Sequence, residues 1–207
     1  HVKALVLGAC PEILGLQECY ELIHRLRSSH PIVVEEILND RRMLRRVRKV
    51  LQSLLQQRVA IRDLVTIMEI CGDHADLLHD IDAVTELCRG ALARQICASV
   101  VDREGNLRVL ALGPVVEARL REAIGEPSGP LKWNPEQVEA FLDAIKKARD
   151  EHDHPPVLIT DPPTRRHVQR LILGAFPDLT VLSTDELVSG FRVEVAALVE
   201  LPEKSPA

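Results

Sequence analysis

The spacing of apolar residues changes near residue 95, and this change constrains the fold more than any other feature of the sequence. Up to that point apolar side chains recur every three or four residues, so we expect four or five helices within residues 1–97. Beyond it, short β-prone runs alternate with helical stretches. The pattern predicts an α+β chain, with an N-terminal all-helical subdomain followed by a small α/β subdomain with a mixed sheet.

The clearest predicted helix runs from Asp40 to Gln57, with Asn39 as its N-cap. At about 100° per residue its apolar residues share one side, namely Met43, Leu44, Val47, Val50, Leu51, Leu54 and Leu55. Six basic residues lie opposite, namely Arg41, Arg42, Arg45, Arg46, Arg48 and Lys49. Such a face is most simply solvated, but it could also bind nucleic acid, anionic lipid or an acidic protein.

The second half of the chain is expected to begin with a hairpin. Two β-prone runs, Ile96–Val101 and Leu107–Leu112, are joined by a short turn-rich loop. Further strands are predicted at Val157–Thr160, Leu179–Leu182 and Val193–Val199, and helices at about 114–124, from Asn134-Pro135 onward, and at Pro163–Ala175. The strand–helix–strand order predicts parallel pairing with a right-handed crossover.

We expect four segments along the chain: the end of a preceding subdomain at 1–14, the helical subdomain at 15–94, the α/β subdomain at 95–201 and a loose tail at 202–207. The chain starts at His1, without Met, inside an apparent helix, so we expect it to be a piece of a longer protein. It contains no apolar run of the roughly 18 residues that a membrane helix needs.

Composition argues against several functions. Aromatic residues make up 2% of the chain and the formal net charge is −5, which disfavours a nucleic-acid binder. The five cysteines contain no Cys-x-x-Cys pair and fit a reducing compartment. Neither a dinucleotide-binding nor a Walker-type glycine motif occurs, so we expect no nucleotide chemistry.

Several blocks, in order, resemble a known family. Residues Arg58–Glu69 are similar to the signature V-S-I-R-D-L-x-T-I-L-E of the FHIPEP family, the flagellar and injectisome export gate proteins of type III secretion. Further blocks resemble that family at Leu14–Glu18, Val50–Leu55, Ala91–Ile96, Pro156–Pro162 with Arg165, and Phe176–Leu187. Asp161 stands where the family has a small polar residue. The resemblance extends from about Leu14 to Val199.

This resemblance implies the last two of four cytoplasmic subdomains of an export gate, without enzymatic activity, cofactor or metal. It implies a homo-oligomeric ring, commonly nonameric, that receives export substrates, their chaperones and other export apparatus proteins. The full-length protein would lie in the bacterial inner membrane, with this region in the cytoplasm and the membrane reached only through a half that this chain lacks. Because the four-subdomain arrangement is incomplete here, we expect weak or no chaperone binding.

Nine residues are candidates for contacts with a partner or with another subunit, namely Gln17, Glu18, Arg41, Arg45, Arg48, Arg62, Asp63, Glu69 and Arg165. The helix predicted at Ile61–Asp73 places Arg62 in its first turn, where a cation opposes the helix dipole. A partner for Arg62 is therefore expected outside the helix, either in the same fold or in a neighbouring subunit. Asp63 suits the same turn, and its simpler role is capping.

Three other clusters have simpler structural explanations. His152-Asp153-His154 could bind a metal, but no further ligand lies at suitable spacing. Cys71 and His74 lack the third group that would orient a nucleophile, and Ser183 with Glu186 predicts a capping box. The alternative function is a nucleic-acid-binding regulator that uses the basic helix 40–57 in a helix-turn-helix-like unit.

Overall fold

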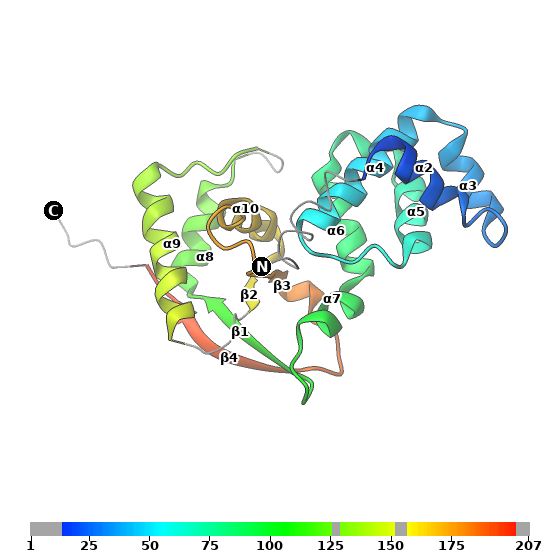
Figure 1. The fold of residues 1–207 in the computed structure, drawn as a ribbon. Helices are drawn as coiled ribbons and strands as arrows, with labels where there is room; N and C mark the ends of the chain where they lie inside the picture. The colour runs from blue at the N-terminus through cyan, green and yellow to red at the C-terminus, as the bar shows by residue number, and fades with distance from the viewer. Residues whose placement is uncertain (1–13, 126–128, 152–156, 202–207) are drawn as a thin grey trace. The chain divides into compact units, whose positions relative to one another are not determined.

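The computed structural model describes residues 14–125, 129–151 and 157–201. The chain divides between Leu92 and Ala93 into a helical unit and an α/β unit (Figure 1). Helices dominate the first unit and a four-stranded sheet organises the second, so the predicted α+β class is confirmed. None of the helices within these ranges is both long and apolar enough to cross a lipid bilayer.

The helical unit is organised around its longest helix, α4. Its elements are α2 (Leu16–His24), α3 (Pro31–Leu38), α4 (Arg41–Gln56), α5 (Leu64–Asp73), the 3-10 helix η1 (Ala75–His79) and α6 (Ile81–Ala91). Helix α4 packs against α2, α3, α6 and η1. Six of its seven predicted core residues are buried, and Leu55 is half-buried at the edge of the same side.

Local capping chemistry fixes where the first helices begin. Pro31 occupies the first turn of α3, where its missing N–H and fixed φ suit a helix start. The prediction that Asn39 is the N-cap of the next helix is wrong by one residue, because Asn39 is the C-cap of α3. Asp40 is the cap instead: its Oδ1 accepts a hydrogen bond from the Arg42 backbone N–H at 2.7 Å.

The α/β unit contains a sheet with strand order β3-β2-β1-β4. Its elements are α7 (Ala93–Val100), β1 (Asn106–Leu112), α8 (Pro114–Ala123), α9 (Pro135–Asp150), β2 (Val157–Thr160), α10 (Pro162–Ile172), β3 (Val181–Ser183), the 3-10 helix η2 (Thr184–Glu186) and β4 (Arg192–Val199). All three strand pairs are parallel, with Leu110 opposite Leu158 and Leu158 opposite Val181. The predicted mixed sheet is therefore corrected to a parallel one.

The predicted hairpin is wrong because its first strand is a helix. Residues 96–101 are β-prone, yet α7 spans Ala93–Val100 and buries Ala93, Ile96 and Cys97 at helical spacing. Packing of that side therefore overrides the intrinsic preference of the isolated run. The Cys97 thiol lies 3.1 Å from the Glu186 carbonyl oxygen and so connects α7 to η2.

The loop between α7 and β1 is a tight turn, as its composition predicts. The Asp102 carboxylate accepts hydrogen bonds from the backbone N–H groups of Glu104 and Asn106, at 2.9 and 2.8 Å. The bond from Asn106 is the main reason that the pKa of Asp102 is lowered. Gly105 adopts φ of +80°, which glycine tolerates without strain.

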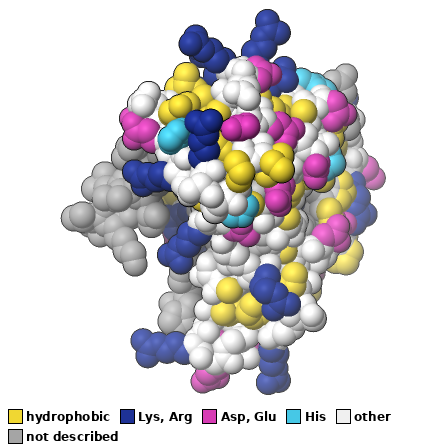
Figure 2. Space-filling view, turned by 90° about the vertical axis from the view of Figure 1, so that its right-hand side faces the viewer, with side chains coloured by type: hydrophobic (Ala, Val, Ile, Leu, Met, Phe, Trp, Pro, Cys, Tyr) yellow, Lys and Arg dark blue, Asp and Glu magenta, His cyan; other side chains and the backbone are white. Residues whose placement is uncertain are grey.

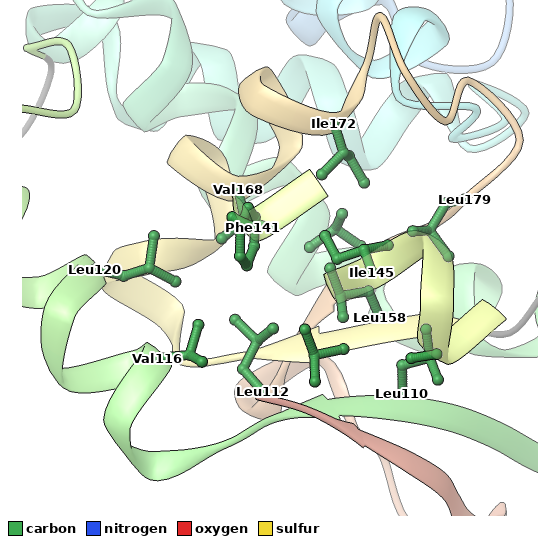
Figure 3. Packing of buried hydrophobic residues seen from close by; sticks show 13 residues of the cluster. Leu110, Leu112, Val116, Leu120, Phe141, Ile145, Leu158, Val168, Ile172 and Leu179 are labelled. Atoms are coloured by element: carbon green, nitrogen blue, oxygen red, sulfur yellow. The ribbon is translucent and has the colours of Figure 1, made fainter. Parts of the chain in front are cut away.

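One continuous core joins three helices to the sheet (Figure 3). The helices α8, α9 and α10 contribute Val116, Leu120, Phe141, Ile145, Val168 and Ile172. The strands contribute Leu110, Leu112, Leu158, Val181 and Val199. Trp133 packs edge-on against Phe141 with ring centroids 5.4 Å apart, so the chain's single tryptophan reports on this unit.

A buried carboxylate joins α8 to the start of α10. Glu117 accepts hydrogen bonds from the Thr160 hydroxyl at 2.8 Å and from the Asp161 backbone N–H at 3.1 Å. On the outer side Arg121 forms an ion pair with Asp161, and this contact raises the pKa of Arg121. Asp161 departs from the resembled pattern, as Ala60 and Met68 do elsewhere, and its ion pair gives it a local structural role.

The core of the α/β unit predicts a large effect for one substitution. Replacing Phe141, which is fully buried, by alanine should lower the free energy of unfolding of this unit by about 3–5 kcal/mol. The measurement is urea denaturation followed by Trp133 fluorescence. Val195→Ala is the matched control, because that side chain is 56% exposed and should cost less than about 1 kcal/mol. Equal costs for the two variants would contradict the core assignment.

Candidate functional site

A groove opens on the helical unit between α2, the end of α3 and the first turns of α4. Its volume is about 550 Å³, and it is lined by Leu16, Gln17, Tyr20, Leu38, Arg41, Leu44 and Arg45. Leucines and a tyrosine ring supply the apolar part, and the two arginines are exposed. The structure thus brings together three of the predicted contact residues, Gln17, Arg41 and Arg45. We call this set of seven residues the basic groove.

The positive charge of the basic groove follows from the burial of α4. Its apolar side lies in the core, so Arg41, Arg42, Arg45, Arg46 and Lys49 are left exposed. Within the part of the chain that the structure describes, no carboxylate forms an ion pair with Arg41 or Arg45. An anionic group that enters the groove would therefore meet two guanidinium groups.

Arg48 differs from the other basic residues of α4, because it is half-buried. It lies close enough to the buried Cys19 for its positive charge to lower the pKa of that thiol. Burial acts more strongly in the opposite direction and raises the pKa of Cys19 to about 11. Arg48 therefore contributes to the contact between α2 and α4, and its assignment to the exposed basic surface is corrected.

A second surface of the helical unit is acidic. On α3, Ile32, Glu35 and Glu36 occupy positions i, i+3 and i+4, so they share one face. On α5, Glu69 and Asp73 are exposed one helical turn apart. The two helices meet closely, since a Cβ atom on Gly72 would lie 3.1 Å from the Glu36 carboxylate oxygens. We call these five residues the acidic face.

The acidic face combines negative charge with one strongly exposed aliphatic side chain. Ile32 is 82% exposed, more than any other large hydrophobic residue among those described. Glu35 forms an exposed ion pair with Arg27 at 3.3 Å. Figure 2 looks onto this side of the helical unit and shows acidic side chains around exposed hydrophobic ones, with Lys and Arg projecting along the upper edge. The predicted contact residue Glu69 belongs to this face.

Sequence reasoning missed Ile32, although a signal was available. Helix α3 carries Val34 and Ile37 on its buried side, and Ile32 falls outside that stripe with two glutamates one turn further on. A single aliphatic residue on the polar side of a helix is ordinary, and it indicates a contact with a partner only when it belongs to a larger surface patch. Here α5, which carries the exposed Glu69 and Asp73, packs against α3, and this packing is visible only in the folded chain.

Asp63 caps α5, as its simpler role predicts. Its carboxylate accepts hydrogen bonds from the Thr66 backbone N–H at 3.2 Å and from the Thr66 hydroxyl at 2.9 Å. Helix α5 therefore begins at Leu64, and Ile61 and Arg62 precede the cap. The expectation that Arg62 opposes the dipole from within the first turn is wrong. Arg62 is exposed beside the helix start, and no ion pair joins it to another of the described residues.

The remaining predicted residues do not converge on one surface. Glu18 is exposed in the first turn of α2, where it complements the helix dipole. Gln17 lines the basic groove and donates a hydrogen bond to the Glu21 side chain at 2.9 Å. Arg165 is 1% exposed within α10. It is buried there, so its assignment as an accessible contact residue is corrected.

The side chains that suggested chemistry have structural roles where the structure describes them. Cys71 is buried, and its pKa is raised, first by a hydrogen bond with Cys88 and then by burial, so the thiol is held neutral. Ser183 and Glu186 form the predicted capping box at η2. His152-Asp153-His154 lies outside the described residues. Within the described ranges, no three His, Cys, Asp or Glu side chains form a metal-binding group.

Known proteins are similar to nearly the whole chain. The model of the FHIPEP family matches residues 1–192. The flagellar biosynthesis protein FlhA of Bacillus subtilis is 32% identical over 206 residues, which cover 97% of this chain and 30% of that protein. The invasion protein InvA of Salmonella typhimurium is 33% identical over 201 residues, which cover 94% and 29%. The chain thus spans somewhat less than a third of the length of these relatives.

Solved structures show the same fold. Nonameric EPEC SctV-C matches with a TM-score of 0.82 and 29% identity over 96% of this chain and 61% of that one. The complex of the Chlamydia pneumoniae proteins CdsV and CdsO matches with 0.83 and 27%, over 97% and 60%. The nonameric EscV cytosolic domain of a type III secretion system matches with 0.77 and 28%, over 94% and 59%.

Capping by Asp63 can be separated from a role in partner contacts. Asp63→Ala should lower the free energy of unfolding of the helical unit by about 1 kcal/mol, because the Thr66 backbone N–H loses its acceptor. Glu69→Ala, which removes an exposed carboxylate from the same helix, should change it by less than about 0.5 kcal/mol. Urea denaturation followed by circular dichroism measures both. A stability cost of Asp63→Ala no larger than that of Glu69→Ala would contradict the capping role.

Proposed function

This chain belongs to the FHIPEP family, and we propose that it is part of the cytoplasmic region of a type III secretion export gate. In this proposal several copies assemble into a ring that receives export substrates and their chaperones. The full-length protein is anchored in the bacterial inner membrane through a region outside this chain. The module itself is not an enzyme: it binds and positions other proteins.

The presence of two different charged surfaces on one helical unit supports ring formation. A two-fold dimer would need one self-complementary patch, whereas a ring needs two different patches that meet head to tail. The basic groove and the acidic face have opposite charge and complementary chemistry. Two structures with the same fold are nonameric assemblies. Head-to-tail contacts that close on themselves produce a ring of this kind.

Contacts with other components of the export apparatus are a second part of the proposal. The CdsV structure that shares this fold is a complex with CdsO, and we expect the present protein to bind a component of its own apparatus. The relatives include a flagellar protein at 32% identity and an invasion protein at 33%.

A nucleic-acid-binding regulator fits the structure less well. The basic side of α4 could approach a phosphate backbone, but the acidic face lies on the same small unit and would repel DNA. The net charge of −5 adds to this repulsion. We therefore expect no shift of duplex DNA at low salt.

Gene replacement in the source bacterium tests the proposed function. Deleting the gene should reduce secretion of type III substrates to background while their synthesis and chaperone levels stay normal, and the full-length gene should restore secretion. Immunoblots of culture supernatants and cell pellets provide the measurement. Normal secretion in the deletion strain, or loss of substrate synthesis instead of export, would contradict an export gate.

A further inference from the structure

We infer that Ile32 of one copy inserts into the basic groove of the next copy, with Glu35 and Glu36 facing Arg41 and Arg45. The inference rests on the proposed ring and identifies the surfaces that build it. It assigns the two charged surfaces of the helical unit to the two sides of a single contact between subunits.

The groove has the chemistry of a socket for an aliphatic side chain beside carboxylates. On α4, Arg41, Leu44 and Arg45 occupy positions i, i+3 and i+4, so the apolar side chain and both guanidinium groups lie along one face. Leu16 and Leu38 add half-buried apolar surface from α2 and α3, and Tyr20 is 40% exposed beside them. A ligand that fits this groove carries both an apolar and an anionic group.

The acidic face offers that combination at the same helical spacing. Ile32, Glu35 and Glu36 also occupy positions i, i+3 and i+4, with the apolar residue one turn from both carboxylates. Glu36 is exposed. Glu35 forms a solvent-exposed ion pair with Arg27, and replacing such a pair by one with another subunit costs little free energy. Among the large hydrophobic side chains described, Ile32 is the most exposed, so its burial in the groove would favour association.

The Ile32 that enters the groove must belong to a second copy rather than to the same chain. Helix α3 contributes Leu38 to the groove and Ile32 to the acidic face. These residues are six positions apart on one rigid helix, about 9 Å along its axis. Ile32 therefore cannot fold back into its own groove. Because donor and acceptor surfaces differ, each copy keeps one of each free for further neighbours, as a ring requires.

Charge reversal in the full-length protein tests this contact. Glu36→Arg and Arg45→Glu should each weaken the contact between two copies at least roughly tenfold, which corresponds to about 1.4 kcal/mol per contact, and should thereby lower the assembled fraction. The double variant Glu36→Arg/Arg45→Glu should restore most of the assembly, because it exchanges the two charges. Glu139→Arg, an exposed reversal on α9 of the α/β unit, is the matched control and should assemble normally.

The readout is the oligomer mass of detergent-extracted protein by native electrophoresis, with protein levels checked by immunoblot. Ile32→Ser provides an uncharged test: it should weaken assembly without lowering thermal stability, because its side chain is 82% exposed. Single reversals that assemble like the parent, or a double variant no better than either single one, overturn the contact. If the parent protein itself forms no oligomer in secreting cells, the proposed ring fails instead.

Discussion

The burial of one side of α4 is the interaction on which the helical unit depends. Six apolar residues of this helix lie in the core between α2, α3, α6 and η1, and their burial supplies much of the unit's stability. The same packing fixes the opposite side outward and so determines where the arginines lie. The groove lies where α2, the end of α3 and the first turns of α4 meet.

The α/β unit is built on a different principle. Its parallel strands are covered by α8, α9 and α10, and a buried carboxylate, Glu117, joins α8 to the end of β2 and the start of α10. Glu117 also accepts a hydrogen bond from the Thr164 hydroxyl at 3.2 Å, so the polar groups bonded to it hold these elements together. The proposed role in binding other proteins is consistent with this structural use of polar groups.

Patterns that depend on one element could be predicted from the sequence, whereas patterns that depend on packing could not. The amphipathic α4, the strand Val157–Thr160 and the Ser183–Glu186 capping box follow from local periodicity and hydrogen bonding. The hairpin prediction failed because β-branched residues in α7 are held in a helix by tertiary contacts. The acidic face was missed because Glu36 comes to lie against Gly72 of α5 only when α3 packs against α5.

Disulfide cross-linking in secreting cells tests most directly whether the helical unit joins copies head to tail. The variant would carry Ile32→Cys and Tyr20→Cys, one on each proposed surface, with Cys10 replaced by Ser; the four other native cysteines are buried. Mild oxidation should produce a ladder of linked oligomers that extends beyond the dimer, and neither single-cysteine variant should form one. Absence of a ladder, or a product that stops at the dimer, would contradict the head-to-tail contact.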